Sequence, residues 1–316
     1  MADIKLDHII TFANVSSIDS YLSFYKKEGF VVGKKTVRHS PGLRNGFVYI
    51  GTEYLEFEWV ENRKEYQQGK LPYHDIFIKN PAPFGIGLTT DDIETLHRNW
   101  RRRGFKVTPV YSRGPRGAKE GDPPWWSFQK IPPVLLPGVW AFALTYLFRK
   151  NKRERIVRIG KNSIYAIKGI TFVVSNPRNR AKKWKKLLAP RASILEEPGI
   201  CRLIIGPHMF TWMTKDAYKN YYGVHYKKPY SGKFAGLREI GLVHCLATDS
   251  EKTLRFLKKS RRCEKFYDRL SKQDAVLAFA KKSDGFTFTV LEMPIRKWMQ
   301  ERIAITREKL KVKPNP

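Results

Sequence analysis

Two short runs near the start of the chain alternate large apolar residues with polar ones, which is the pattern of a half-buried strand. They are residues 6–10 (Leu-Asp-His-Ile-Ile) and residues 53–59 (Glu-Tyr-Leu-Glu-Phe-Glu-Trp). Successive side chains of a strand point to opposite faces of the sheet. In the second run, Glu56 and Glu58 are therefore predicted to share one face, and the apolar residues are predicted to share the other.

Strict alternation in the first run would place Leu6 and His8 on one face and Asp7 and Ile9 on the other. A histidine and a glutamate that face into the same concave sheet can bind a divalent cation or act as acid and base. The alternative is that both are ordinary polar residues of the sheet. The pattern leaves both interpretations open.

A helix is predicted between the two runs, over residues 16–30, because serines open it, apolar residues recur at helical spacing, and a Gly-Phe pair ends it. Residues 37–39 and 46–50 are predicted to be short strands. The first unit thus contains one strand, one helix and three strands. Similar patterns begin near residues 84, 170 and 240, which predicts four copies of the unit.

Two stretches are harder to interpret. The apolar run Val134–Phe148 is followed by basic residues, but it is shorter than the roughly 20 apolar residues of a membrane-spanning helix and is interrupted by a Pro-Gly pair. We expect a buried strand there, with a membrane-surface anchor as the alternative. Residues 218–230 are aromatic and lysine-rich without a clear period, so a loop is expected.

Several motifs of the first unit are distinctive together: Asp7-His8-Ile9-Ile10, Gly29-Phe30, Arg38-His39, Asn45 and Tyr54-Leu55-Glu56. They resemble the glyoxalase-like branch of the vicinal oxygen chelate superfamily. This resemblance implies an α+β fold of tandem βαβββ modules, whose curved mixed sheets surround a cavity that often holds a metal. It covers the first sixty residues well and becomes weaker beyond about residue 130.

Four segments are expected from this fold. Residues 1–148 would form a glyoxalase-like domain of two modules, and residues 149–161 would form a basic linker. Residues 162–294 would form a second, more divergent domain of the same type, and residues 295–316 a C-terminal helix and tail.

The resemblance also implies roles for individual residues. The candidate metal ligands are His8, Glu56, His244 and Glu292; the candidate catalytic residues are Glu56 and Glu58; the candidate substrate-binding residues are His39 and Asn45. The cofactor would be a divalent metal such as zinc, iron, manganese or nickel. Neither pair of modules has a full set of ligands in the sequence, because a glycine stands at the expected histidine position of the second module and Thr145 is aligned with its glutamate.

The chain is strongly basic, with 60 Lys and Arg against 29 Asp and Glu and a formal net charge of +31. Such a charge favours anionic partners. We therefore expect a small-molecule substrate, and an anionic one would be attracted by the positive charge of the chain. Nucleic acid or an anionic membrane surface are the alternative partners. The basic runs are residues 101–103, 149–158 and 178–186, although no nucleic-acid-binding motif accompanies them.

Cysteine content and the N-terminus indicate a cytoplasmic protein. Cys201, Cys245 and Cys263 are an odd set without C-x-x-C pairing, which is typical of a reducing compartment. The first residues include an acidic side chain and no apolar run, so no signal peptide is expected.

Three functions follow from these observations. The first is a metal-dependent lyase, isomerase or dioxygenase acting on a small substrate with vicinal oxygens, in which Glu56 or Glu58 is the base. The second is a non-catalytic binding or resistance protein with the same cavity. The third is a basic protein that binds nucleic acid or membrane. A fold alone does not choose among them.

Overall fold

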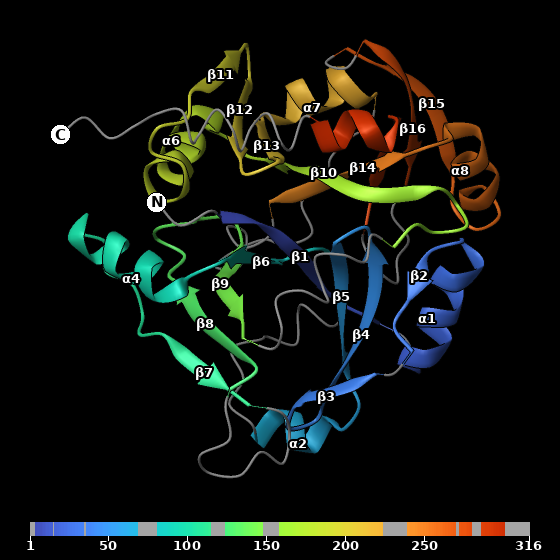
Figure 1. Ribbon diagram of the computed structural model, residues 1–316. Helices are drawn as coiled ribbons and strands as arrows, with labels where there is room; N and C mark the ends of the chain where they lie inside the picture. Colours follow the sequence, from blue (N-terminus) through green and yellow to red (C-terminus); the bar gives the residue numbers. More distant parts are fainter. Residues whose placement is uncertain are drawn as a thin grey trace.

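The computed structural model describes residues 4–14, 16–34, 36–68, 81–114, 124–147, 158–223, 239–269, 272–279 and 286–300. These residues form two mixed β-sheets, each with helices packed against it (Figure 1). The first sheet contains strands up to Tyr146, and the second begins at Ile164. The fold is therefore α+β with two mixed sheets, as the sequence predicted.

Two βαβββ modules build the first sheet. The first module contains β1 (Ile4–Phe12), α1 (Ile18–Lys27), β2 (Val31–Val32), β3 (Val37–Ser40), β4 (Leu43–Ile50) and β5 (Glu53–Val60), followed by α2 (Arg63–Gln68). The second contains β6 (Gly85–Thr90), α4 (Ile93–Arg102), β7 (Tyr111–Arg113), β8 (Trp126–Ile131) and β9 (Trp140–Tyr146). The strand order is β2-β4-β5-β1-β6-β9-β8-β7, with β3 beside β4.

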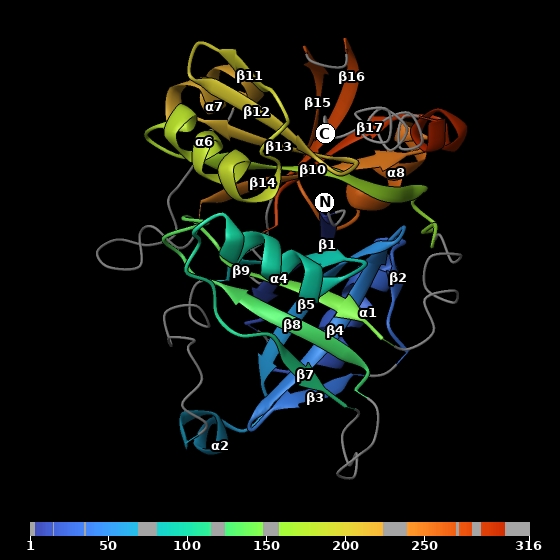
Figure 2. The ribbon, with the colours of Figure 1, turned by 60° about the vertical axis from the view of Figure 1, so that its left-hand side comes forward.

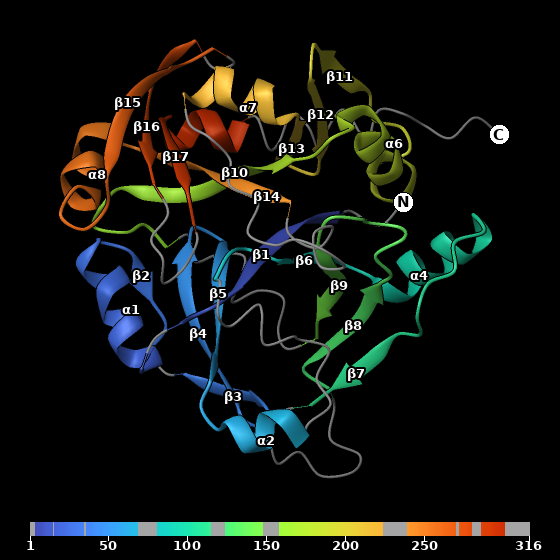
Figure 3. The same cartoon turned by 180° about the vertical axis from the view of Figure 1, so that it is seen from behind.

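The centre of the first sheet is the antiparallel pair β1 and β6, flanked by β5 parallel to β1 and by β9 parallel to β6. The sheet is curved, and α1 and α4 lie on its outer side (Figures 1 and 3). We call the opposite face, away from α1 and α4, the inner face. Strand β9 lies within the apolar run that the sequence analysis expected to hold a buried strand, so that prediction is confirmed.

The second sheet repeats the plan. Its elements are β10 (Ile164–Val173), α6 (Pro177–Leu188), β11 (Ile194–Glu197), β12 (Ile200–Ile205), β13 (His208–Met213), α7 (Lys215–Tyr222), β14 (Ile240–Ala247), α8 (Ser250–Leu257), β15 (Cys263–Asp268), β16 (Gln273–Ala278) and β17 (Phe288–Glu292). The strand order is β11-β12-β13-β10-β14-β17-β16-β15. Residues 295–300 are helical, as expected, and the rest of the predicted C-terminal helix and tail lies outside the described residues.

Helix α7 replaces the loop that the sequence analysis expected from residue 218. Thr214 caps its start by accepting a hydrogen bond from the Ala217 backbone N–H, and Gly223 ends it in the left-handed conformation with φ 70°. Tyr218 and Tyr222, one turn apart, are buried. The start and stop signals outweighed the irregular apolar pattern, so the prediction of a loop was wrong here.

The largest hydrophobic core runs through both halves of the molecule. It contains side chains from the helix-covered faces of both sheets, including Phe57 and Trp100 from the first half and Trp184 and Phe286 from the second. The rings of Phe57 and Phe286 lie 5.7 Å apart across the junction. The two sheets are therefore joined by a shared interior.

Candidate functional site

A β-bulge in β1 brings Asp7 and His8 to the same face. Leu6 pairs with Leu88 and His8 pairs with Gly87, so Asp7 is the extra residue of the bulge. Asp7 Oδ2 lies 2.7 Å from His8 Nδ1. The expected alternation, with Asp7 opposite His8, was wrong because the bulge shifts every side chain after it by one position.

The two faces of the strand separate the core from the candidate site. Leu6 and Ile9 belong to the main core, whereas Ile10 and Phe12 pack in a smaller cluster on the inner face. His8 shares the inner face with Ile10 and Phe12, since successive even positions of a strand point the same way. Only 1% of its surface is exposed.

His8 and Glu56 form the centre of a polar cluster on the inner face. Glu56 is opposite Ile10 in the parallel pairing of β1 and β5, and its Oε2 lies 3.3 Å from His8 Nε2. Asn45 on β4 donates from Nδ2 to Glu56 Oε1. This hydrogen bond fixes the position of the Glu56 carboxylate beside His8.

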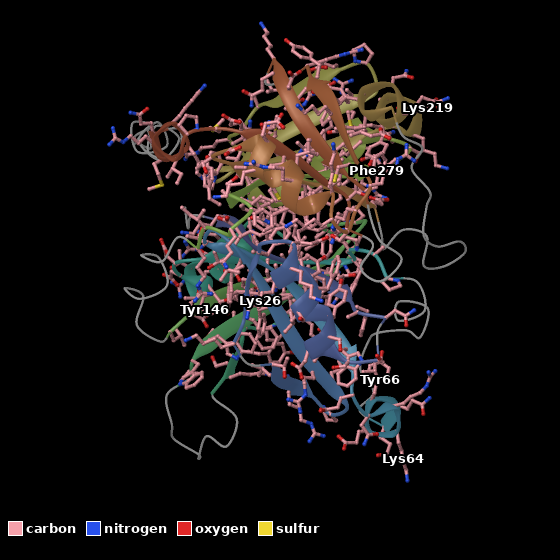
Figure 4. The ribbon with its side chains drawn as sticks, turned by 90° about the vertical axis from the view of Figure 1, so that its right-hand side faces the viewer. Lys26, Lys64, Tyr66, Tyr146, Lys219 and Phe279 are labelled. Carbon is pink, nitrogen blue, oxygen red and sulfur yellow. The ribbon has the colours of Figure 1, made fainter. Side chains whose placement is uncertain are left out.

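A second hydrogen bond fixes Asp7. The Tyr146 hydroxyl, from β9, donates to Asp7 Oδ2 over 2.8 Å and lies 3.3 Å from the hydroxyl of Tyr54. Figure 4 places Tyr146 in the half of the molecule that holds the first sheet. The bulged aspartate is thus held by the second module and in turn orients the imidazole of His8.

Aromatic rings line the cluster. The Tyr54 ring stacks on His8 at 4.6 Å, and the Phe142 ring is tilted against His8 at 5.3 Å. Phe142, Phe47 and Trp140 are half-buried, so the apolar surface beside the polar cluster is in part open to solvent. A few buried polar groups among aromatic side chains are typical of small-molecule sites.

The other two candidates of this half stay predictions. Glu58 is on the same strand face as Glu56 and is 1% exposed, and it pairs in register with Asn45 of β4. His39 lies in β3, beside β4; its side chain lies outside the described part of the structure.

The ligand positions of the second module are occupied by residues that do not bind metals. Gly85 stands at the histidine position and is opposite Trp140 in the parallel pairing of β6 with β9. Phe142 is two residues beyond Trp140. Counted in the same way, Glu56 is two residues beyond Tyr54, the partner of His8. Phe142, not Thr145, therefore stands where the second module would offer a glutamate; the Thr145 hydroxyl donates instead to the Thr90 carbonyl over 2.8 Å.

The described residues supply only part of a metal site. A separation of 3.3 Å between His8 Nε2 and Glu56 Oε2 fits two ligands that are each about 2.1 Å from one ion. However, within the described ranges no group of three His, Cys, Asp or Glu side chains is placed to hold a metal ion. Catalytic zinc and non-haem iron use three protein ligands, so we derive no step of a mechanism through a metal here.

The histidine of the second sheet, His244, has different hydrogen-bond partners. His244 Nε2 and Nδ1 each lie 2.7 Å from a threonine hydroxyl, of Thr171 and Thr289 respectively. Burial lowers the pKa of His244 to about 4. The side chain is therefore a neutral, hydrogen-bonded residue at neutral pH.

Glu292 does not lie beside His244. In the pairing of β14 with β17, His244 is opposite Thr289 and Glu292 is opposite Ala247, three residues along the strand. The Glu292 carboxylate caps α8 by accepting hydrogen bonds from the backbone and hydroxyl of Ser250, at 3.0 and 2.8 Å. By the register that relates His8 to Glu56, the equivalent residue is Leu291.

A small cavity occupies the inner face of the second sheet beside His244. Its volume is about 20 Å³, room for about one water molecule. It is lined by Lys168, Arg202, Met209, Thr211, Met213, Tyr221, Tyr222, His244, Asp268 and Leu291. Leu291 fills the position of a ligand carboxylate there. The two sheets thus have the same plan, but only the first brings a histidine and a glutamate together.

Two curved sheets of βαβββ modules, with a histidine and a glutamate paired on an inner face, define a protein of the vicinal oxygen chelate type. A family model described as a glyoxalase-like domain matches residues 6–188. This match covers more than half of the chain, so the chain belongs to the glyoxalase-like domain family. No curated protein matches it.

Solved structures share the fold at low sequence identity. A 4-hydroxymandelate synthase mutant from Streptomyces coelicolor is 11% identical with a TM-score of 0.56, over 98% of this chain and 100% of that one. A Mn(II)-bound glyoxalase from Novosphingobium aromaticivorans is 10% identical with a TM-score of 0.54, over 92% and 83%. A catechol 2,3-dioxygenase is 8% identical with a TM-score of 0.54, over 92% and 88%. These likenesses show the fold alone.

A helix that spans a membrane is long and apolar. Across the described ranges, none of the helices combines the length and the apolar character that crossing a bilayer requires.

Proposed function

We propose that the chain is a glyoxalase-like enzyme in which His8 and Glu56 transfer a proton of a small substrate with vicinal oxygens. The supporting observation is the contact between His8 Nε2 and Glu56 Oε2 at 3.3 Å, with Asp7 on the other ring nitrogen. An imidazole whose Nδ1–H donates to a carboxylate presents Nε2 as its basic nitrogen. Nε2 and the Glu56 carboxylate then lie beside one position, from which either group can take up a substrate proton.

Each neighbour has a defined part in this proposal. Asn45 orients Glu56, the proposed general base, through its hydrogen bond to the carboxylate. Asp7 is a positioning residue, because it touches His8 and acts through it. The half-buried rings of Phe47, Trp140 and Phe142 would support the apolar part of a substrate.

Deuterium exchange tests the proposal without knowledge of the natural substrate. Small α-hydroxyketones and α-hydroxy acids would be incubated with the protein in D₂O, and exchange of the C–H beside the carbonyl would be followed by ¹H NMR. We expect Glu56→Gln to lower the exchange rate by about 10²-fold or more, the contribution of a general base. Asp7→Asn should reduce the rate less and shift its pH profile, since it alters the imidazole.

Glu61→Gln is the matched control. Glu61 is a carboxylate near the end of the same strand, paired with Arg44 on the surface, and its loss should leave exchange unchanged. Exchange in the wild type that is unaffected by Glu56→Gln contradicts the proposal. A second contradicting result is exchange that requires about one divalent ion per chain, together with loss of that ion from the double variant His8→Ala with Glu56→Ala. These residues would then act as metal ligands.

A non-catalytic binding protein is the second candidate. It is supported by Gly85 and Phe142, which occupy the ligand positions of the second module. It would bind small aromatic or oxygenated molecules at the inner face without exchange or turnover. Saturable binding by calorimetry, together with no exchange in any substrate, would select it over the enzyme.

A further inference from the structure

Two basic runs that are more than seventy residues apart in the sequence meet on one surface. The first is at the end of α4 and the second is on α6, and the two helices lie side by side where the halves of the molecule join (Figures 2 and 3). Trp100 Nε1 donates to the Leu187 carbonyl over 3.1 Å. The Arg103 guanidinium donates to the carbonyls of Lys186 and Leu187. The position of the helices is therefore fixed by direct bonds.

A cleft of about 560 Å³ lies between these elements. We call it the basic cleft; it is lined by Arg103, Lys182, Lys185, Lys186, Pro190, Ser193, Ile194 and Glu196. The three lysines are at positions i, i+3 and i+4 of α6, so they follow one side of the helix with about 5–6 Å between neighbouring Cβ atoms. Such a row presents several cations at once to a repeating anion.

The negatively charged and partially negative groups of the basic cleft already have partners within the protein. Glu196 is paired with Arg178 at 3.1 Å. The carbonyls at the C-terminal end of α6, where the helix dipole is negative, accept hydrogen bonds from Arg103. Glu196 therefore does not cancel the positive charge of the three lysines of α6.

The surroundings distinguish between the two classes of anionic partner. An amphipathic membrane anchor inserts exposed apolar side chains into the bilayer. Among the described residues, the large apolar side chains that are exposed do not line the basic cleft. A concave cleft also admits a strand or a phosphate more readily than a flat bilayer. Trp100 and Trp184, the aromatic residues within the two basic runs, are 1% and 0% exposed, so they do not stack on bases.

From these observations we propose that the basic cleft binds the sugar–phosphate backbone of a nucleic acid, independently of base sequence. The site is separate from His8 and Glu56 and does not depend on their chemistry. Charge contacts with phosphates release counterions, so affinity should fall steeply with salt. The described residues that line the cleft include no aromatic side chain, which predicts little preference among sequences.

The test compares two triple variants of the full chain that remove the same charge. The first replaces Lys182, Lys185 and Lys186 with Gln, and the control replaces Lys26, Lys27 and Lys258. Each lowers the formal net charge of +31 by three. Lys26, Lys27 and Lys258 are exposed and lie at the ends of α1 and α8, on the opposite side of the molecule (Figures 1 and 4). Gln is a good helix former, so both variants should fold.

Binding would be measured by fluorescence anisotropy with labelled mixed-sequence DNA of about 20 nucleotides, longer than typical single-strand sites, from about 50 to about 200 mM KCl. We expect the cleft variant to bind at least about tenfold more weakly, with the slope of log K against log salt reduced by about 2 to 3. The control should resemble the wild type. Circular dichroism spectra would confirm that both variants are folded.

Three outcomes would overturn the proposal. The first is no binding by the wild type at the lowest salt. The second is an equal loss in both triple variants, which would mean that net charge and not the cleft attracts DNA. The third is binding to phosphatidylserine vesicles that depends on the three cleft lysines while DNA binding does not, which would assign the surface to a membrane.

Discussion

The buried ion pair between Glu28 and Arg261 should be a principal bond between the two halves of the molecule. Glu28 is the C-terminal cap of α1, and Arg261 follows α8; the two helices lie side by side (Figure 1). Arg261 Nε and Nη2 donate to the two carboxylate oxygens of Glu28 at 2.9 and 3.1 Å. The exposed fractions of the two side chains are 0% and 1%. We predict that Glu28→Gln destabilises the whole chain.

The size of the effect follows from burial. Removing one partner of a buried pair costs about 3–5 kcal/mol, because it leaves the other charge buried and uncompensated. Arg261 keeps a hydrogen bond to the Phe286 carbonyl at 3.1 Å, and the Gln amide still accepts one bond. A loss of about 3 kcal/mol is therefore expected. For a chain of 316 residues this corresponds to a decrease of about 5 °C in Tm if unfolding is a single transition.

Differential scanning calorimetry would measure the decrease. The control is Glu264→Gln, which removes the partner of Arg262 in a pair whose side chains are 74% and 43% exposed; its Tm should change by no more than about 1 °C. Replacing both buried partners, as Glu28→Leu with Arg261→Met, should restore part of the loss, since the two effects are coupled. If Glu28→Gln and Glu264→Gln have the same Tm, the pair does not join the halves.

Two further predictions concern the two histidines. A Cβ at Gly87 would lie 2.1 Å from His8 Cε1, so Gly87→Ala must displace the imidazole and should reduce the rate of deuterium exchange by about 10²-fold. The control is Gly85→Ala, whose Cβ would lie 3.2 Å from its neighbours and which should change the rate little. Equal rates for the two variants would contradict this geometry. Burial lowers the pKa of His244 from its ordinary value of 6.5 to about 4, so the unfolded chain takes up this proton first. Stability should therefore fall as pH decreases from 6.5 to about 4, by about 3 kcal/mol in total. His244→Gln should flatten the dependence of urea midpoints on pH in this window, and an unchanged slope would refute the assignment.

Local patterns predicted the modules because each element is strongly periodic. Glu56 and Glu58 alternate with Leu55 and Phe57, and the structure places Leu55 and Phe57 in the main core. The pairing of His8 with Glu56 was expected from a family resemblance, since periodicity says nothing about which strands become neighbours. It required β1 and β5 to lie side by side, as they do.

Register was beyond the reach of the sequence. The bulge at Asp7 depends on how β1 meets β6, and no local signal marked it; the Asp-His dipeptide beside a Gly-x-Gly strand is a clue only in retrospect. Glu292 was aligned with Glu56 one residue out of phase, and a slip of one residue moves a side chain to the other face. The structure assigns that position to Leu291.

The shared interior at the junction links the evolution of the two halves. Phe57 of β5 packs on Phe286, and Phe30 lies near Phe288, with ring centres 5.7 and 6.1 Å apart. In a close-packed interior, a change of volume on one side must be matched on the other. The second half is therefore needed for the fold that positions His8, because its apolar side chains complete the shared interior, even though Leu291 occupies the position of a ligand there.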